Sequence, residues 1–310
     1  MHTTEQDPPS VRVVLAGATG DLGRRIAHAL AARGAQVVAL VRPGSNPQHL
    51  AGLRAEGIQI HAVSFDDAED LRAAMTDAVC VVSALNGLEA VIIGLQGRLL
   101  DAAVAAGVPR FIPSDFSLDY TRTRVGDNRN LDLRRRFMAQ LDQAPIAATS
   151  ILNGGFIKLL EGDARLVGPG HRVMHFGDAD QPLDFTAKDD VATFTAAAAL
   201  DADAPRWLRI AGDSVSPAQI ATCMRDITGH RYRTFRTGGI GTMSAIIAAV
   251  RALTPDTDAP FPAWQGMQYL RDMMSGRGKL QTLDNTRYGD RRWVSARDTL
   301  ARCTLKAETP

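Results

Sequence analysis

Three glycines near the start of the chain have a spacing that indicates chemistry. They are Gly17, Gly20 and Gly23, in the stretch GATGDLG between an apolar run and a helix-like pattern. A strand-to-helix turn without side chains lets a pyrophosphate approach the amides at a helix N-terminus. The spacing is GxxGxxG rather than GxGxxG, but the strand before it and the helix after it are the context that such a motif requires. We therefore expect a dinucleotide site here. Its residues are Gly17, Thr19, Gly20, Asp21, Leu22 and Gly23.

The end of the second apolar run distinguishes the two nicotinamide dinucleotides. A site that prefers NAD places Asp or Glu about 20 residues after the glycines, to bond the ribose 2′-hydroxyl. The run QVVALVRPGSN has no such acid, and Arg42 stands there with Ser45 close behind. A guanidinium and a hydroxyl suit a 2′-phosphate, because paired phosphate oxygens match the planar fork of arginine. The pattern favours NADPH over NADH, unless Arg42 is an ordinary solvated loop residue.

Tyrosine and histidine offer further reactive groups, each with a plainer interpretation. Tyr120 lies four residues before Arg124 and could form a tyrosine–base pair, although a surface loop is the favoured interpretation. His171 and His175 are four apart, but GPGHRVMHFGD is typical of a turn entering a strand, where such positions lie about 13 Å apart. We therefore expect no metal site. A position of His175 in a substrate pocket is the second hypothesis.

These candidates need a scaffold, and short β-branched runs that alternate with helical patterns predict one. We expect an α/β fold with a doubly wound parallel sheet and helices on both faces. The predicted strands cover 11–16, 36–41, 58–65, 78–85, 108–113 and 146–152, and the predicted helices cover 22–33, 67–76, 89–106 and 129–142.

After about residue 155 the alternation becomes less regular. A helix near 188–200, the strand RWLRIAG and a helix from Pro217 still resemble sheet elements. We therefore divide the chain into a dinucleotide-binding domain at 1–155 and a remainder at 156–310. The remainder has sheet elements at about 185–230 and a smaller, irregular substrate-binding subdomain at about 156–184 and 231–310.

Composition limits the partners of the chain. Its 310 residues carry 35 Lys and Arg against 34 Asp and Glu, a formal charge of +1, which argues against nucleic acid or an anionic membrane surface. The three cysteines are far apart, so we expect no disulfide framework, and a reducing cytoplasm fits them. The N-terminus MHTTEQDPPS lacks an apolar segment, and no stretch is long and apolar enough to span a membrane. A small molecule is the expected partner, and a homodimer is left open.

Several motifs in order resemble the NmrA-like and isoflavone-reductase-like family of atypical short-chain dehydrogenases/reductases. They are GATGDLG, LVRPGS, VVSALNG, AAVAAGVPRFIPSDFSLDY, ILNGGF and LDFTAKDDVATF, and they span most of the chain. The resemblance implies a Rossmann-type domain that binds NADPH and a smaller C-terminal subdomain that shapes the substrate pocket. It implies that Phe65 and Asp66 lie near the adenine, Ser83, Ala84 and Leu85 near the nicotinamide ribose, and Pro113, Ser114, Phe116, Asn153 and Phe156 around the nicotinamide. Phe116, Leu118 and His175 are the expected substrate contacts.

The chain departs from this family at its catalytic lysine. None of the four lysines has a tyrosine four residues before it, so the YxxxK motif is absent. By the resemblance, the lysine of the isoflavone-reductase-like branch falls at Arg134, and no lysine precedes Lys158. Arginine does not release a proton in proteins, but it can bind a developing oxyanion. The alternative for Arg134 is a solvated helix face, because LRRRF holds three consecutive arginines.

Three functions follow from these features. The first is an NADPH-dependent oxidoreductase that delivers hydride to a carbonyl, or to a conjugated alkene or imine, of a small apolar or aromatic molecule. Arg134 would act as a fixed cation, with water or Tyr120 as the proton source. The second is a non-catalytic NADP(H) sensor of the NmrA type. The third is a cofactor-dependent isomerase or epimerase without net redox change.

Overall fold

The computed structural model describes residues 11–161, 166–254 and 258–308. The N-terminal decapeptide, on which part of the localisation prediction depends, lies outside the described residues. The chain forms two compact units, each built from three segments. The first unit is Met1–Ser114, Phe137–Ser150 and Ala192–Arg206, and the second is Asp115–Arg136, Ile151–Val191 and Trp207–Pro310.

A six-stranded parallel sheet forms the centre of the first unit, in the order β3-β2-β1-β4-β5-β6. Its strands are β1 (Arg12–Ala16), β2 (Gln36–Val41), β3 (Gln59–Ala62), β4 (Ala78–Ser83), β5 (Arg110–Ile112) and β6 (Ala147–Ala148). Most residues of β1, β2, β4 and β5 are buried, as expected for a parallel sheet covered on both faces. The predicted fold class is confirmed.

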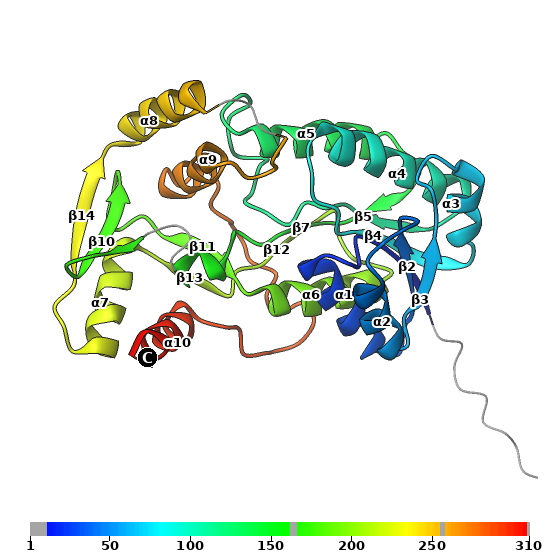
Figure 1. Ribbon diagram of the computed structural model, residues 1–310, viewed down its shortest axis with the longest axis horizontal. Coiled ribbons are helices and arrows are strands. Elements are labelled where there is room, and N and C mark those ends of the chain that lie inside the picture. The colour runs from blue at the N-terminus through cyan, green and yellow to red at the C-terminus, as the bar shows by residue number, and fades with distance from the viewer. Residues whose placement is uncertain (1–10, 162–165, 255–257, 309–310) are drawn as a thin grey trace, which may run out of the picture. The chain divides into compact units, whose positions relative to one another are not determined.

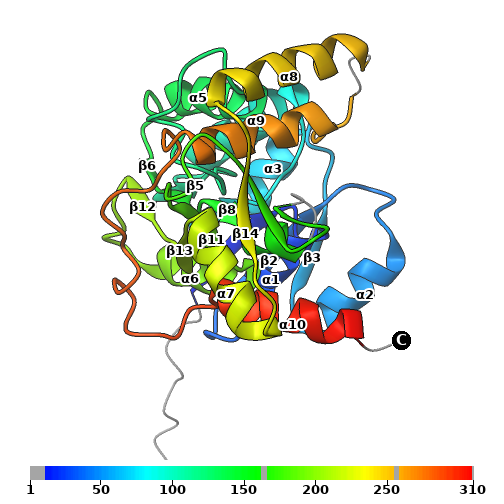
Figure 2. The ribbon, with the colours of Figure 1, turned by 90° about the vertical axis from the view of Figure 1, so that its left-hand side faces the viewer.

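Helices cover both faces of this sheet. They are α1 (Asp21–Ala31), α2 (Pro47–Ala55), α3 (Ala68–Ala74) and α4 (Gln96–Ala105), and a π-helical segment, Ala90–Leu95, precedes α4. Figures 1 and 2 show α1 and α2 on one face and α3 and α4 on the other. The strand order reverses between β1 and β4, and sheets of this kind bind ligands at the carboxyl edge beside such a reversal.

A buried arginine joins the three segments of the first unit. Arg110 in β5 is 7% exposed, and its Nη1 donates to Thr149 Oγ1 (2.6 Å) and to the carbonyl oxygen of Ala204 (2.8 Å). Its Nη2 donates to the carbonyl oxygen of Ala202 (2.6 Å). The segment at 192–206 therefore satisfies a charge that the sheet buries.

The second unit contains three small sheets and several helices. The sheets have the orders β14-β10-β9, β13-β11-β8 and β12-β7. The strands are β7 (Ser150–Leu152), β8 (Gly155–Phe156), β9 (Val167–Gly168), β10 (Arg172–Phe176), β11 (Leu183–Thr186), β12 (Trp207–Arg209), β13 (Asp213–Val215) and β14 (Arg233–Gly238). The helices are α7 (Pro217–Thr228), α8 (Ile240–Leu253), α9 (Ala263–Met274) and α10 (Ala296–Glu308), while α5 (Arg129–Leu141) and α6 (Lys188–Leu200) have residues in both units.

The region from 231 to 290 is more regular than predicted. It holds β14, α8 and α9, and the two helices pack together around Met243, Ile247 and Trp264. Trp264 is fully buried, with the guanidinium carbons of Arg129 and Arg251 4.7 and 5.0 Å from its ring centroid. These apolar side chains form a core between the helices.

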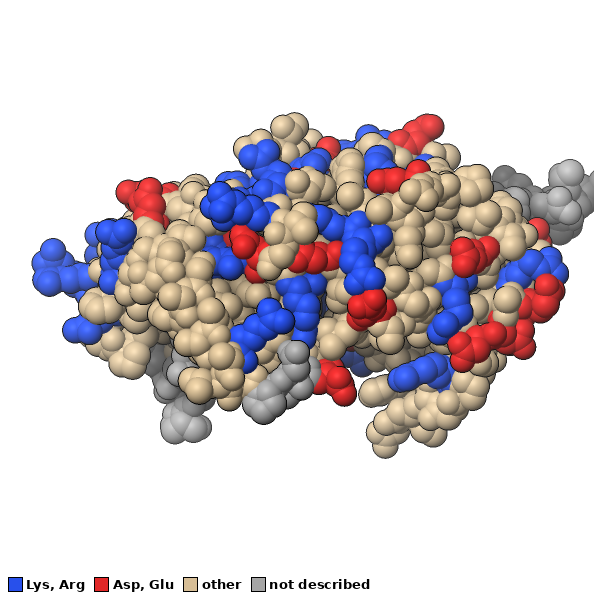
Figure 3. All heavy atoms as spheres, turned by 90° about the horizontal axis from the view of Figure 1, so that it is seen from above, with Lys and Arg blue, Asp and Glu red and all other residues tan. Residues whose placement is uncertain are grey.

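Charged side chains are distributed in small groups. On the face seen in Figure 3, basic and acidic residues alternate with uncharged areas. Among the described residues, no helix combines the length and the hydropathy that a membrane span requires.

Candidate functional site

The glycine loop lies where β1 ends, against the end of β4. Ala16 pairs with Ser83 in the strand register, and the amide of Ala84 donates to the carbonyl oxygen of Ala16 (2.9 Å). Gly17 has a φ of +87°, and a Cβ there would lie 2.6 Å from the carbonyl oxygen of Ala84. A Cβ at Gly23 would lie 2.1 Å from the carbonyl oxygen of Gly17. The backbone itself therefore requires glycine at both positions.

The middle glycine leaves room for a ligand. A Cβ at Gly20 would meet only the carbonyl oxygen of Gly17, at 3.3 Å, and Gly20 is exposed. Gly20 is also the N-cap of α1 and provides no side-chain cap. Asp21, in the first turn, pairs with Arg25 (2.8 Å) on the exposed surface. The loop thus fits a pyrophosphate, which can occupy the space that a side chain at Gly20 would fill and bond the first amides of the helix.

The two residues predicted to bind the 2′-phosphate share one turn after β2. The amide and the hydroxyl of Ser45 both donate to the carbonyl oxygen of Arg42, at 3.1 and 2.7 Å. The Arg42 side chain is exposed. Since β2 is the parallel neighbour of β1, this turn lies at the same sheet edge as the glycine loop.

The ends of β4 and β5 meet through a serine and a glutamine. Ser114 Oγ donates to the carbonyl oxygen of Leu85 (2.6 Å), and the Ser114 amide donates to Gln96 Oε1 (2.9 Å). Ser83 is fully buried, and its hydroxyl has no hydrogen-bond partner within the described part of the chain. Polar groups at this edge are thus fixed in place, with one hydroxyl left unsatisfied.

The residues predicted near the adenine lie together after β3. Phe65 and Asp66 line a cavity of about 230 Å³ that α3 and α4 also border. Phe65 is buried, and Asp66 is exposed and forms an ion pair with Arg98 (3.1 Å).

The interpretation of Tyr120 as part of a surface loop is wrong. Tyr120 is fully buried, its hydroxyl donates to Asp115 Oδ2 (2.7 Å), and its ring packs edge-on against Trp207 at 6.0 Å. Arg124, the predicted base, is exposed. The phenol therefore has a carboxylate as its partner.

The three consecutive arginines of α5 have three different environments. Arg134 is 7% exposed, its Nη1 donates to the carbonyl oxygen of Asn130 (3.0 Å), and its Nε has no hydrogen-bond partner among the residues described. Arg135 binds Asp132 and the carbonyl oxygen of Tyr120. Arg136 is exposed. The solvated helix face is thus the wrong interpretation for Arg134.

The predicted substrate and nicotinamide residues of the second unit are mostly buried. Phe116 and Leu118 are buried, as is Asn153, whose Oδ1 lacks a hydrogen-bond partner in the described chain. Phe156 is half-buried, and Lys188 Nζ lies 5.3 Å from its ring centroid. Asn153 therefore offers an unsatisfied acceptor, and Phe156 lies next to a cation.

His175 lies in β10 as a buried imidazole. It is 4% exposed, and its Nδ1 has no hydrogen-bond partner among the described residues. Burial lowers the pKa of His175, Arg236 lowers it further, and Asp178 opposes them. His171 stacks instead on His230, with ring centroids 4.7 Å apart. No group of three or more metal-ligating side chains occurs among the described residues.

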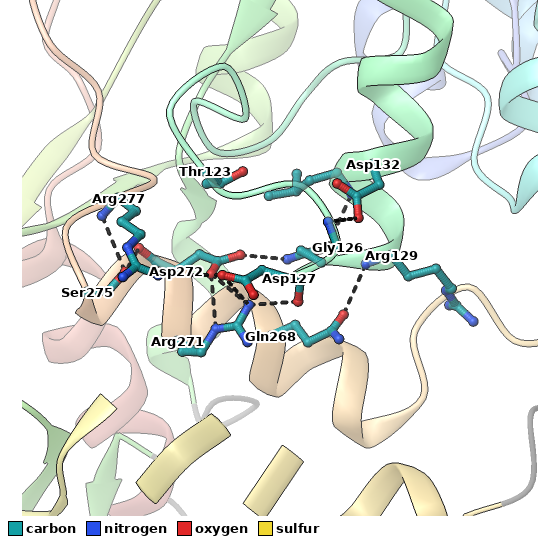
Figure 4. Close-up of polar contacts among 12 residues, drawn as sticks. Thr123, Gly126, Asp127, Arg129, Asp132, Gln268, Arg271, Asp272, Ser275 and Arg277 are labelled. Atoms are coloured by element: carbon teal, nitrogen blue, oxygen red, sulfur yellow. Dashed lines mark hydrogen bonds and ion pairs between the residues drawn. The ribbon is translucent and has the colours of Figure 1, made fainter. Parts of the chain in front are cut away.

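The start of α5 is held by polar side chains of α9. Gln268 Oε1 accepts from the amide of Arg129 (3.2 Å), as Figure 4 shows. Asn128 donates to Asp272 Oδ2 (3.0 Å) and accepts from Gln265 (2.8 Å). Burial raises the pKa of Asp272, although an ion pair with Arg271 and the bond from Asn128 oppose the rise.

Comparison with known proteins identifies the family. The profile of the NmrA-like family matches residues 9–244. This chain belongs to the NmrA-like family. The resemblance found in its motifs is therefore confirmed.

Relatives within this family include named reductases. The bifunctional pinoresinol-lariciresinol reductase of Linum usitatissimum is 31% identical over 199 residues, which cover 59% of this chain and 63% of that protein, less than two thirds of its length. The isoflavone reductase homolog IRL of Zea mays is 30% identical over 237 residues, which cover 72% of this chain and 76% of that protein. The solved structure of AtPrR2 with NADP+ and (+)pinoresinol has a TM-score of 0.81 at 22% identity, covering 96% of this chain and 100% of that one. That likeness shows a shared fold.

Of the lysines of this NmrA-like chain, Lys188 lies beside Phe156, a residue predicted near the nicotinamide. Lys158 is exposed, and Lys279 forms an ion pair with Asp184 and a hydrogen bond to Ser214 (2.9 Å). The side chain of Lys306 lies outside the described residues.

Two buried polar residues were missed from the sequence. Gln96 fixes Ser114 from a fully buried position, and Asp272 is buried at 1% exposure. For Gln96, the only signal was a polar residue on the apolar face of its helix.

Proposed function

We propose that this chain is an NADPH-dependent reductase of a small apolar or aromatic molecule. The observation that carries the proposal is the glycine loop, which closes on the end of β4 at Gly17 and leaves room for a ligand at Gly20. The names of two relatives, pinoresinol-lariciresinol reductase and isoflavone reductase homolog, support reduction of an aromatic substrate.

The residues that would hold the cofactor lie at the carboxyl edge of the six-stranded sheet. The amides after Gly20 would bind the pyrophosphate, and Arg42 with Ser45 would bind the 2′-phosphate. The ends of β4 and β5, with Ser83 and Ser114, would hold the nicotinamide ribose and ring. When bound, NADPH supplies a hydride to an electrophilic carbon of the substrate.

Arg134 would stabilise the negative charge that then develops on the substrate oxygen. Its burial strengthens such an interaction, and its Nε is a donor without a partner among the described residues. Loss of one preorganised donor of this kind costs about 2.7–4 kcal/mol of transition-state stabilisation. Arginine cannot supply the proton, so another group must.

Cofactor preference and turnover test the proposal together. NADPH should bind more tightly than NADH, and Arg42→Ala should weaken NADPH binding by about 10- to 150-fold, because a charge-assisted bond contributes about 1.5–3 kcal/mol. Calorimetry measures both affinities, and loss of reduced-nicotinamide absorbance with a panel of aromatic carbonyls, lignans and isoflavones measures turnover. Arg54→Ala, which removes an exposed arginine of α2, is the matched control.

Other outcomes identify the alternatives. Equal affinities for NADPH and NADH contradict the assignment of Arg42. Tight NADPH binding without consumption favours a sensor, and product isomerisation without consumption favours an isomerase or epimerase. A cytoplasmic location and a homodimer stay predictions from the sequence, and light scattering of the purified chain tests the second.

A further inference from the structure

One segment of the second unit combines positive charge with exposed apolar side chains. It runs from residue 227 to residue 254 and contains β14 and α8. It has four arginines and no Asp or Glu, a formal charge of +4, whereas the whole chain carries +1. All four are exposed, and none forms an ion pair with a described residue; they are Arg231, Arg233, Arg236 and Arg251. The charge of the whole chain therefore conceals a strongly basic segment.

Strand β14 forms the edge of its sheet and exposes an aromatic ring. The order β14-β10-β9 leaves one side of β14 without a neighbouring strand in the described chain. Phe235 is 43% exposed, and the guanidinium carbon of Arg172 in β10 lies 5.2 Å from its ring centroid. Arg172 pairs in register with Arg233, which shares the face of Phe235 because it lies two residues before it. The ring thus lies among guanidinium groups.

Helix α8 is apolar on two faces, of which α9 covers one. Met243 and Ile247 pack with Trp264 of α9. The exposed residues that form the other face recur at spacings of one helical turn, and they are Ala245, Ile246, Ala249, Ala252 and Leu253. Helices that are apolar all round normally lie in an apolar environment, yet Leu253 is 85% exposed. Figure 3 shows uncharged atoms with basic side chains beside them at its left-hand end, where Figure 1 places α8 and β14.

The charge of this segment limits what can cover it. A second copy of the chain would bring arginines against arginines, because the segment has no acid to pair with them. The partner must therefore be anionic. The large apolar side chains of α8 are separated by alanines, and a fluid lipid phase can receive single side chains without the close shape complementarity of protein interfaces.

We propose that β14 and α8 form a docking surface for a bilayer that contains anionic lipids. Phe235, Ile246 and Leu253 enter the boundary between headgroups and acyl chains, and the four guanidinium groups stay among the lipid phosphates. This surface does not depend on the proposed function, because it concerns where the chain is held and not what it reduces.

Flotation with lipid vesicles tests the role of the charges. The chain should bind vesicles of phosphatidylcholine and phosphatidylglycerol in a two-to-one ratio, and not vesicles of phosphatidylcholine alone. Raising NaCl from about 0.1 to about 1 M should release it, because the Debye length falls from about 10 to about 3 Å. Arg233→Gln with Arg236→Gln should weaken binding about 25-fold, since each arginine near an anionic surface contributes about fivefold. Arg54→Gln with Arg124→Gln removes the same charge at exposed sites elsewhere and should bind like the unmodified chain.

A second pair of variants tests the apolar face. Leu253→Ser should weaken vesicle binding about fivefold or more, because less apolar surface leaves water. Leu305→Ser, at an exposed leucine of α10, is the matched control and should bind normally. Thermal unfolding checks that every variant is folded.

Three results would overturn the proposal. The first is no binding to the anionic vesicles, or equal losses in the variants and their controls. The second is binding to poly-L-glutamate but not to vesicles, which would favour an acidic protein partner. The third is a dimer, seen by light scattering, that Leu253→Ser dissociates, which would favour a second copy of the chain.

Discussion

Gly20 and Gly23 lie in the same loop but should respond differently to substitution. Gly20→Val should abolish NADPH binding and leave the unfolding midpoint nearly unchanged, because its Cβ points into the space left for the ligand. Gly23→Ala should lower the free energy of unfolding by about 1–3 kcal/mol, since its Cβ would overlap the backbone of Gly17. Calorimetry and thermal unfolding measure the two effects. Tight NADPH binding by Gly20→Val would contradict the pyrophosphate assignment.

His175 should make the stability of the chain sensitive to mild acid. Its pKa is lowered in the fold, whereas in the unfolded chain it is about 6.5. Between these two pKa values the unfolded state binds more protons, so stability falls as pH drops below about 6.5. The unfolding midpoint of His175→Gln should therefore fall less between pH 7 and 5. His49→Gln, at an exposed histidine, should behave as the unmodified chain does. Parallel curves for all three proteins would refute this assignment.

At the scale of single residues, the glycines that the backbone conformation requires could be predicted from the sequence. Contacts between side chains that are far apart in the chain could not. The three glycines lie in one short segment between the strand and the helix that place them, so their spacing was informative. The role of Arg42 stays a prediction. Gln268 and the amide of Arg129, which are hydrogen-bonded, come from helices far apart in the chain, and no local pattern relates them. The burial of Tyr120 likewise depends on Asp115 and on packing that its own segment does not reveal.

At the scale of the element, α5 should depend on Arg135 for stability. Arg135 binds the carbonyl oxygens of Tyr120 and Thr123 and the carboxylate of Asp132, so it joins α5 to the loop before it. Arg135→Ala should lower the free energy of unfolding by about 1.5–3 kcal/mol, the range for bonds to charged groups. Arg124→Ala, at an exposed arginine of the loop before α5, should change it by less than about 0.5 kcal/mol. Denaturant unfolding compares the two, and equal losses would show that Arg135 has no special part.

Elements with strong periodicity were predicted well, and those without it were not. The six strands of the first sheet were found because β-branched runs alternate with helices. Helix α2 buries only Leu53 and has almost no apolar face, so only Asn46 as cap and Pro47 at the first turn indicate it. In the region from 231 to 290, the frequent prolines and glycines argued against helices, so α8 and α9 were not predicted. The apolar residues of each helix are buried by the other helix, and this cannot be inferred from either segment alone.

At the scale of the whole molecule, the predicted domain boundary at residue 155 can be tested by truncation. A fragment of residues 1–155 lacks Ala202 and Ala204, whose carbonyl oxygens bind the guanidinium of Arg110. The buried guanidinium would keep only Thr149 Oγ1 of its three acceptors, and a buried charge that loses partners is strongly destabilising. This fragment should therefore show no cooperative thermal transition by circular dichroism. The fragment 1–206 retains all three segments of the first unit and should show one. Cooperative unfolding of the shorter fragment would instead support residue 155 as an independent boundary.

The packing of Trp264 gives the chain an internal optical reporter. Its indole is fully buried in the core that α8 and α9 form and has two guanidinium groups near its ring, whereas Trp207 and Trp293 are half-buried. An indole shielded from water emits at shorter wavelengths than a hydrated one and is poorly reached by dissolved quenchers. Separation of α8 from α9 would therefore shift part of the intrinsic fluorescence to longer wavelengths and allow iodide to quench it. The emission spectrum can thus follow one helix pair while the rest of the chain stays folded.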